Sequence, residues 1–183
     1  MPTGIDVDNT IAVTDTAALQ RLNRRFGTRY NREQLRDHNV ERALKLSPEQ
    51  VAFIRGIFED EEFYLRLPCL KRAVEGVNTI AEADDVVYIT ARPEKFADVT
   101  VCWLSDRGFP VGELVCGVED KGLVALEYGC EACIEDYPSH ALQIVARGIP
   151  VYMILCPWNR DFEHPLVTKM RNWGEIIALL QEG

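Results

Sequence analysis

The sequence predicts an α/β fold: a three-layer sandwich with a central parallel sheet and a small helical cap inserted between the first and second strands. Short apolar runs recur along the chain and alternate with stretches of helical periodicity, which is typical of this class. The runs lack strict alternation of apolar and polar residues, so we expect both faces of the sheet to be covered. One long stretch without a strand-like run, residues 15–67, predicts the cap.

Five apolar runs predict the strands, and the stretches between them predict helices. The strands are expected at 4–7, 86–90, 113–116, 132–135 and 150–155, and the helices at 70–83, 94–107, 121–128, 138–147 and 172–181. Gly108, Gly129 and Gly148 each follow a predicted helix, where a left-handed residue commonly ends one. Ser139 and Asn172 are predicted to begin the last two helices, because their side chains can accept a hydrogen bond from a free backbone N–H group.

The cap segment is predicted to form helices at 15–26, 32–44, 47–58 and 60–66, with Ser47 and Pro48 a typical helix start. An ordinary crossover between parallel strands is much shorter than this segment. The segment is therefore expected to lie over the carboxyl edge of the sheet. The predicted domains are a core of residues 1–14 and 68–183 and a cap of residues 15–67.

Composition excludes several classes of protein. The chain of 183 residues carries 20 Lys and Arg against 29 Asp and Glu, a formal net charge of −9. This balance argues against stable binding to a nucleic-acid backbone. No apolar run approaches the roughly 20 residues of a membrane span, and no leader precedes the first strand, so we expect a cytoplasmic protein without membrane contact. Base rates favour a monomer or a homodimer.

Two local features admit more than one interpretation. Cys130 and Cys133 form a lone pair among six cysteines, without a second pair or a nearby histidine to complete a zinc site. Buried free thiols in a reducing compartment are the expected outcome. Between residues 20 and 45, eight basic residues stand against three acidic ones. These basic residues either form solvated helix faces or include side chains that face an anionic substrate.

Polar side chains stand at or just beyond the carboxyl end of each of the first four predicted strands. They are Asp6, Asp8 and Thr10 for the first strand, Thr90 and Arg92 for the second, Lys121 for the third, and Glu135 and Asp136 for the fourth. In open parallel sheets, ligands bind outside the carboxyl ends of the strands. These side chains are therefore expected to converge on one site.

Carboxylates crowded at one edge of a sheet would repel one another unless a cation lay among them. Hard oxygen ligands in small number favour Mg²⁺, which keeps several waters and shares a substrate phosphate. Asp6 could attack phosphorus, and Asp8 could protonate the leaving oxygen and then activate water. Thr90 and Lys121 would hold the transferred phosphoryl oxygens. Each feature alone is common in turns and helix starts, but their joint occurrence in this order predicts phosphoryl transfer.

The same residues resemble the four motifs of the haloacid dehalogenase (HAD) superfamily, over essentially the whole chain. Asp6, Asp8 and Thr10 match the first motif, Asp-x-Asp-x-Thr; Thr90 matches the second, a Ser or Thr that ends a strand; Lys121 matches the third; and Glu135 and Asp136 match the acidic fourth. The resemblance implies a HAD-like Rossmannoid core with a phosphatase activity, since members that cleave carbon–halogen bonds lack the second aspartate.

The resemblance also assigns roles. It implies that Asp6 is the nucleophile, which forms an aspartyl-phosphate, and that Asp8 is the general acid and base. It implies a Mg²⁺ ion held by Asp6, by Asp8 through its carbonyl and by the acidic pair of Glu135 and Asp136, with Asp136 favoured as the direct ligand.

Within the superfamily, the chain is similar to the 5'-nucleotidase type C group, which includes the 5'(3')-deoxyribonucleotidases. The helical insertion, the run at residues 63–68 and the segment Pro157-Trp158-Asn159-Arg160 carry this similarity. The first motif of that group commonly reads Asp-x-Asp-Gly, whereas Asn9 follows Asp8 here. The similarity implies a magnesium-dependent phosphomonoesterase that acts on (deoxy)nucleoside monophosphates.

Four residues are candidates for substrate binding. Phe63 and Tyr64 could stack on a base, or they could pack the interior of the cap. Arg92, two residues beyond Thr90, could contact a phosphate or a sugar, and Thr10 belongs to the first motif. Three other functions stay open: a phosphatase for another small phosphorylated metabolite, a phosphatase for nucleic-acid 3' ends, and a non-catalytic regulatory module on the same fold.

Overall fold

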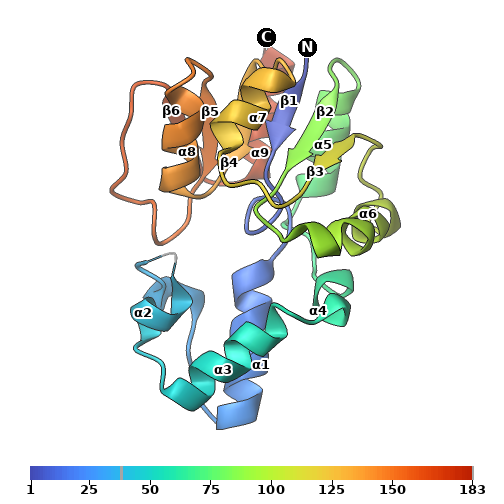
Figure 1. Ribbon diagram of the computed structural model, residues 1–183. Helices are drawn as coiled ribbons and strands as arrows, with labels where there is room; N and C mark the ends of the chain where they lie inside the picture. The colour runs from blue at the N-terminus through green and yellow to red at the C-terminus, as the bar shows by residue number, and fades with distance from the viewer. Residues whose placement is uncertain (38, 183) are drawn as a thin grey trace.

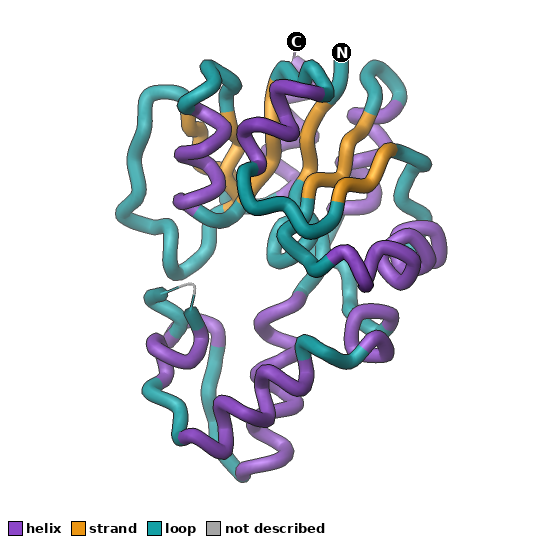
Figure 2. Tube along the Cα trace, in the orientation of Figure 1, coloured by secondary structure: helices purple, strands orange, loops and turns teal. Residues whose placement is uncertain are grey.

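A six-stranded parallel sheet lies between two layers of helices in the computed structural model, which describes residues 1–37 and 39–182 (Figures 1 and 2). The strands are β1 (Thr3–Ile5), β2 (Val86–Ile89), β3 (Glu113–Val115), β4 (Ala132–Glu135), β5 (Val151–Ile154) and β6 (Val167–Met170). Their order across the sheet is β3-β2-β1-β4-β5-β6. The predicted three-layer α/β fold is confirmed.

Alternation along the strands supplies an apolar surface to each helical layer. In β2, Val86 and Tyr88 pack in the cluster that includes α5, α6 and α9, whereas Val87 and Ile89 pack with α7 and α8. The core helices are α5 (Ala73–Ala81), α6 (Ala97–Asp106), which the short 3-10 helix η2 (Glu94–Phe96) precedes, α7 (Lys121–Glu127), α8 (Pro138–Val145) and α9 (Trp173–Glu182). Gly76 lets α5 approach α9, because a Cβ atom there would lie 2.3 Å from the ring of Trp173.

The cap segment forms helices on the carboxyl side of the sheet, in the lower half of Figure 1. They are α1 (Thr14–Phe26), the 3-10 helix η1 (Arg32–Gln34), α2 (Val40–Leu44), α3 (Pro48–Ile57) and α4 (Glu61–Leu65). Ser47 caps α3 as predicted, since its hydroxyl accepts a hydrogen bond from the Gln50 N–H group. Leu22 of α1 and Ile54 of α3 are buried in the cluster that continues into the core.

The predicted helix over 32–44 is wrong, because η1 and α2 stand in its place; residue 38 of that range lies outside the described residues. The Asn39 N–H group donates to Asp37 Oδ1 at 2.8 Å, and Asn39 Oδ1 accepts from Arg42 N at 2.9 Å. Such side-chain bonds to the backbone compete with a continuous helix. They start a new helix at Val40 instead.

Several element ends also differ from prediction. The strand β6 was not predicted, because residues 167–169 are partly or fully exposed at the sheet edge and the strand forms no apolar run. Ser139 does not begin α8, which starts one residue earlier at Pro138, a residue favoured in the first turn. Asn172 does begin α9, since its Oδ1 accepts from Gly174 N at 2.8 Å. The three predicted helix-ending glycines all have positive φ angles.

The sequence predicts no membrane span and free, buried thiols at Cys130 and Cys133. None of the helices in the described part of the chain has the length and apolar content that a bilayer crossing needs. All six cysteines are free, and Cys130 and Cys133 are buried. The acidic cluster described below includes neither of them.

Candidate active site

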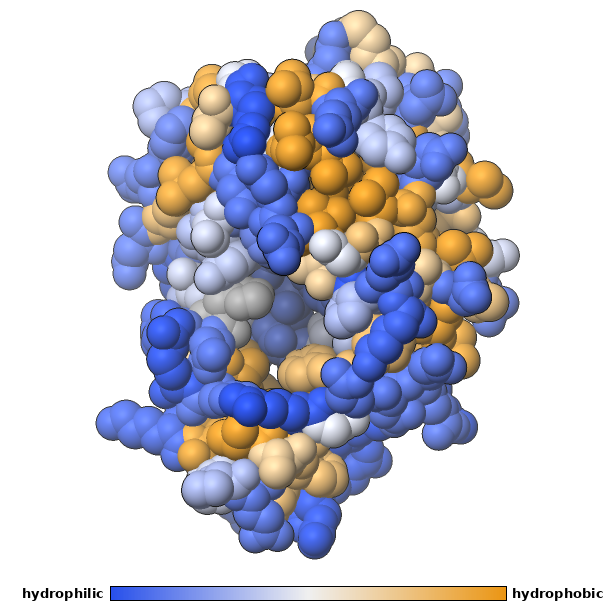
Figure 3. All heavy atoms as spheres, viewed as in Figure 1, coloured by the Kyte–Doolittle hydropathy of each residue, from blue (hydrophilic) through white to orange (hydrophobic). Residues whose placement is uncertain are grey.

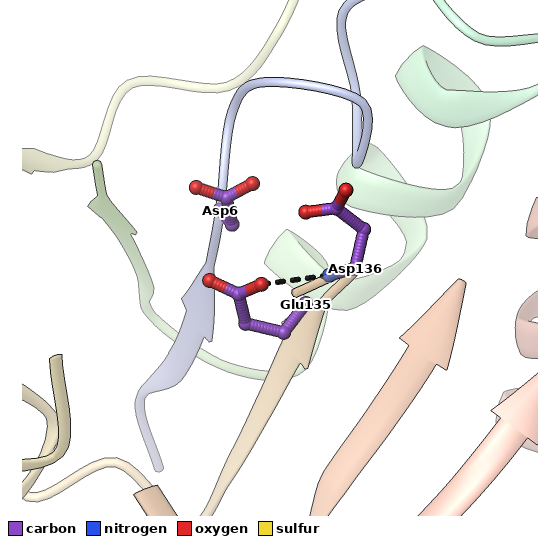
Figure 4. Close-up of side chains that lie close together, drawn as sticks. All are labelled: Asp6, Glu135 and Asp136. Atoms are coloured by element: carbon purple, nitrogen blue, oxygen red, sulfur yellow. Dashed lines mark hydrogen bonds between the residues drawn. The ribbon is translucent and has the colours of Figure 1, made fainter. Parts of the chain in front are cut away.

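Three acidic side chains surround one space beyond the carboxyl ends of β1 and β4 (Figure 4). Asp6 follows β1 directly, Glu135 is the last residue of β4, and Asp136 follows it. Because β1 and β4 are neighbours in the sheet, residues just beyond their ends lie side by side. A carboxylate oxygen from each residue lies within 4.8 Å of the others, and each residue is at most 6% exposed.

Lys121 supplies the positive charge of this cluster. It begins α7, is almost fully buried, and its Nζ donates to Asp6 Oδ1 and, at 2.5 Å, to Glu135 Oε1. Burial alone would lower the pKa of Lys121, but the charges of the two carboxylates raise it above its ordinary value. The ammonium group is therefore charged and held between the two strands.

Glu135 is bound by the protein on both carboxylate oxygens. Its Oε2 accepts from the N–H groups of Asp136 and Tyr137 at 2.7 Å each, and its Oε1 lies 3.1 Å from His140 Nδ1 in addition to its contact with Lys121. Burial would raise the pKa of Glu135, but the charges and hydrogen bonds of Lys121 and His140 hold it well below the ordinary range. These contacts suit Glu135 to orienting Lys121 and leave Asp6 and Asp136 as the freer ligands for a cation.

Asp136 has the orphaned atom of the site. Its Oδ2 is the one buried side-chain nitrogen or oxygen among the described residues with no hydrogen-bond partner. Burial and the charges of Glu135 and Asp6 raise the pKa of Asp136 well above its ordinary value. Burial also raises the pKa of Asp6 to about 6, against the opposing charge of Lys121. A buried orphan oxygen beside a second carboxylate fits a hard divalent cation, which would lower both pKa values.

The loop after β1 fixes the first motif. Asn9 has a φ of 60°, a left-handed conformation that glycine adopts freely and asparagine tolerates better than most residues. The backbone therefore explains how Asn9 can stand where Asp-x-Asp-Gly motifs have glycine. Asn9 Oδ1 also accepts from the Asp15 N–H group at 3.0 Å. Thr10 is fully buried, and its hydroxyl donates to Asp6 Oδ2 at 2.9 Å, so Thr10 orients Asp6 and does not line the cavity.

Asp8 and Arg92 form an ion pair at the mouth of the cluster. Arg92 donates to Asp8 through Nε and Nη2 at 2.8 Å each, and its guanidinium carbon lies 4.6 Å from the ring centre of Tyr64. The Thr14 hydroxyl also donates to Asp8. Burial would raise the pKa of Asp8, but the charge and hydrogen bonds of Arg92, with the Thr14 bond, hold it below the ordinary value. Asp8 is thus ionised and doubly bound in this conformation.

A cavity of about 480 Å³ opens above the carboxylates, and a hollow is visible between core and cap in Figure 3. Its core side includes Asp6, Asp8, Thr90, Arg92 and Asp136. Its cap side includes Asp15 of α1, the start of α2, one face of α3 with the residue after it, and a residue of α4. Beyond Asp15, these residues are Asn39, Val40, Glu41, Arg42, Ile54, Arg55, Phe58 and Tyr64. Eight of the ten predicted site residues therefore meet around one space, six at the cavity wall and two, Lys121 and Glu135, directly behind it. Thr10 supports Asp6 from outside the cavity.

The structure does not bring Phe63 to this cavity. Its side chain is 2% exposed, its ring packs edge-on against Phe58 and Tyr64, and Arg21 lies over its face. Phe63 therefore packs inside the cap, which is the alternative that the sequence left open. We do not retain it as a substrate-binding residue.

Asp15 and His140 are two of the cavity residues that were not among the sequence candidates. Asp15, in the first turn of α1, is buried, and burial raises its pKa to about 6. His140, in α8, lines the cavity and lies against Glu135. Its position in the first turn of the predicted helix that follows Glu135 and Asp136 was the available signal.

Comparisons with known proteins agree with the fold and the motifs. A model of the family described as "5' nucleotidase, deoxy (Pyrimidine), cytosolic type C protein" matches residues 1–182. A relative from Clostridium acetobutylicum, named a nucleotidase, is 23% identical, with 96% of this chain and 91% of the relative covered.

Among solved structures, a HAD family hydrolase from Deinococcus radiodurans, with bound phosphate and sodium, matches with a TM-score of 0.69 at 11% identity, covering 99% of this chain and 95% of that one. YfnB from Bacillus subtilis, bound to magnesium, matches with a TM-score of 0.64 at 15% identity over 98% of each chain.

Proposed function

The chain belongs to the cytosolic type C 5' nucleotidase family and is a HAD-type hydrolase of phosphoric monoesters; we propose that it uses magnesium and an aspartyl-phosphate to dephosphorylate nucleoside monophosphates. The observation that carries the proposal is the pairing of Asp6, bound by Lys121 and Thr10, with the orphaned Oδ2 of Asp136 at the floor of the cavity. We also propose that residues 15–67 act as the cap of a core made of 1–14 and 68–183.

The reaction proceeds in two steps. An Asp6 carboxylate oxygen attacks phosphorus, the bond between phosphorus and the ester oxygen breaks, and the proton of Asp8 passes to that oxygen. Asp8 then takes a proton from a water molecule, whose oxygen attacks the phosphoryl group on Asp6, so that phosphate leaves and the free carboxylate returns. Because Arg92 holds Asp8 ionised in this conformation, the acid step requires Asp8 to leave Arg92 and to take up a proton from solvent before it meets the leaving oxygen.

The phosphoryl group has defined partners in the cavity. Thr90 lies at the cavity wall just beyond β2, where its hydroxyl can donate to a phosphoryl oxygen. Lys121 neutralises charge on the Asp6 side, and Arg92, once released from Asp8, can bind the substrate. Asp6 and Asp136, with the Asp8 carbonyl, would hold Mg²⁺, which when bound supplies charge neutralisation at the phosphoryl oxygens. Two of the structural neighbours carry magnesium or phosphate in their own structures.

The cavity fits a nucleoside monophosphate. Its volume of about 480 Å³ lies within the usual range for small-molecule sites. Ile54, Phe58 and Tyr64 give it an apolar wall on the cap side, on which a base can lie, while Arg42 and Arg55 add positive charge at the rim. We also propose the cytoplasmic location that the sequence predicts, which agrees with the description of the matching family as cytosolic.

The test is phosphate release from a panel of phosphomonoesters, with and without Mg²⁺. The panel contains ribo- and deoxynucleoside 5'- and 3'-monophosphates, sugar phosphates and a 3'-phosphorylated oligonucleotide. We expect a magnesium-dependent preference for nucleotides, and at least a 10⁴-fold loss, roughly the effect of removing a nucleophile in other hydrolases, in Asp6→Asn. Circular dichroism of the variant checks that the fold is retained.

Each other outcome changes the proposal in a defined way. Activity on sugar phosphates alone would retain the reaction and overturn the nucleotide assignment. Preference for the 3'-phosphorylated oligonucleotide would move the substrate to nucleic-acid ends. Wild-type activity in Asp6→Asn would exclude the covalent step. No phosphate release from any compound of the panel would favour a regulatory module.

A further inference from the structure

The loop after β5 holds the backbone of Asp136. This segment, Pro157-Trp158-Asn159-Arg160, has no role in the proposed reaction. Asn159 is fully buried, and its Nδ2 donates to Asp136 O at 2.7 Å and to Ile154 O at 2.8 Å. Its Oδ1 accepts from Cys156 N at 2.9 Å. The side chain thus ties the loop, the end of β5 and the residue after β4 together.

Trp158 makes a second bond to the same carbonyl. Its Nε1 donates to Asp136 O at 3.1 Å, so that this oxygen accepts from both Trp158 and Asn159. A carbonyl oxygen has two lone pairs, and both are directed here at fixed donors. The Asp136 backbone is therefore immobilised, while its carboxylate retains the orphaned Oδ2.

The opposite side of this loop contacts the cap. Arg32 of η1 places its guanidinium carbon 5.2 Å from the ring centre of Trp158, and its Nη2 lies 2.9 Å from Cys156 Sγ. The next cap residue, Glu33, accepts from Arg160 Nη2 at 2.6 Å. On the core side, Lys169 of β6 donates to Arg160 O at 2.5 Å and braces the loop.

We propose that the loop 157–160 is the docking site for the cap segment Arg32–Gln34 and that it couples cap docking to the metal affinity of Asp136. Trp158 is the positioning residue that joins the two functions, since its indole N–H group holds Asp136 while its ring receives Arg32. The inference rests on the proposed metal-dependent reaction. When the cap is docked, Arg32 restrains the indole, and Asp136 presents its carboxylate in one place; when it departs, that restraint is lost.

The experiment is calorimetric titration of the metal-free protein with Mg²⁺, combined with kinetics on the preferred substrate. Trp158→Phe keeps a ring for Arg32 but removes the donor, and we expect the Mg²⁺ Kd to rise about tenfold, as for other residues that orient metal ligands. Arg32→Gln should raise it about threefold. The double variant should bind about as weakly as Trp158→Phe alone, because both changes act through one contact. Arg25→Gln, which removes a cap arginine stacked on Phe26, is the matched control and should bind normally.

Metal rescue separates positioning from general damage. If Trp158 acts through metal affinity, kcat of Trp158→Phe should return to the wild-type value at saturating Mg²⁺. Two results would overturn the coupling: wild-type Mg²⁺ Kd values in both single variants, or a Kd in the double variant that equals the product of the two single effects. In either case, hydrolysis by the wild-type protein would still uphold the proposed function. A wild-type protein that neither binds Mg²⁺ nor hydrolyses the panel would overturn both.

Discussion

The two walls of the cavity are built on opposite physical principles. On the core side, Asp6, Lys121 and Glu135 are at most 6% exposed, and Lys121 binds both carboxylates directly. On the cap side, Arg55 pairs with Glu41 through two hydrogen bonds of 2.7 and 2.8 Å, but the Arg55 side chain is 69% exposed. Both walls carry ion pairs, yet only those of the core are shielded from water.

This difference separates chemistry from recognition. Charges in a water-excluded site interact strongly and are already oriented before the substrate arrives, which is what stabilisation of a transferring phosphoryl group requires. Exposed pairs are weak and exchange readily with water. The cap side can therefore rearrange around a substrate at little cost, whereas the buried cluster of Asp6, Lys121 and Glu135 cannot change without loss of stability or activity.

The sharpest test of this contrast is Lys121→Met. It leaves the carboxylates of Asp6 and Glu135 buried without their counter-charge, so we expect the metal-free protein to lose about 3–5 kcal/mol of unfolding free energy. Urea denaturation near neutral pH measures the loss. Lys95→Met removes an exposed ion pair with Glu59 that bridges core and cap, and it should cost less than about 0.5 kcal/mol. Equal losses in the two variants would contradict the contrast.

A second test uses the pH dependence of Asp15, the buried cap residue at the cavity. Its pKa is about 6 in the folded protein against an ordinary 3.8, so between these values the folded state binds more protons than the unfolded state. Stability is therefore lost as pH rises through this window. Asp15→Asn removes the loss, and we expect it to be more stabilising at about pH 7.5 than at about pH 4, by up to about 3 kcal/mol.

Urea denaturation at the two pH values, with the exposed Asp161→Asn as control, measures the effect of Asp15. The same stability difference between variant and wild type at both pH values would show that Asp15 does not titrate in this window. The pKa of Asp15 would then be close to its ordinary value, as expected for the exposed carboxylates of the cap.

The smallest effect is expected for Arg55→Gln, on the exposed side. The midpoint of urea unfolding should not change, because a solvated ion pair contributes little. KM for an anionic substrate should rise about threefold at low salt, with kcat unchanged, since one positive charge leaves the rim. Steady-state kinetics at low and high salt measures this. A large fall in kcat would show that Arg55 takes part in the chemistry.

The site residues could be predicted from the sequence where their position next to a strand end or a helix start was enough. Asp6, Thr90 and the pair Glu135-Asp136 each end a strand-like run, and Lys121 begins a helix. Position relative to a strand end survives errors of one or two residues in the strand itself, as the shorter β1 shows. The edge strand β6 could not be predicted in the same way, because half-exposed residues leave no apolar run.

The fold class, the order of the four motifs and the members of the core cluster follow from the amino-acid sequence, because parallel strands bring their carboxyl ends to one edge whatever packs around them. Which cap side chains face the cavity depends on tertiary packing. Phe63 and Tyr64 are neighbours in one helix, yet Phe63 packs inside the cap and Tyr64 reaches Arg92. The rotation of a short helix is set by packing against distant residues, which local periodicity over five residues does not specify.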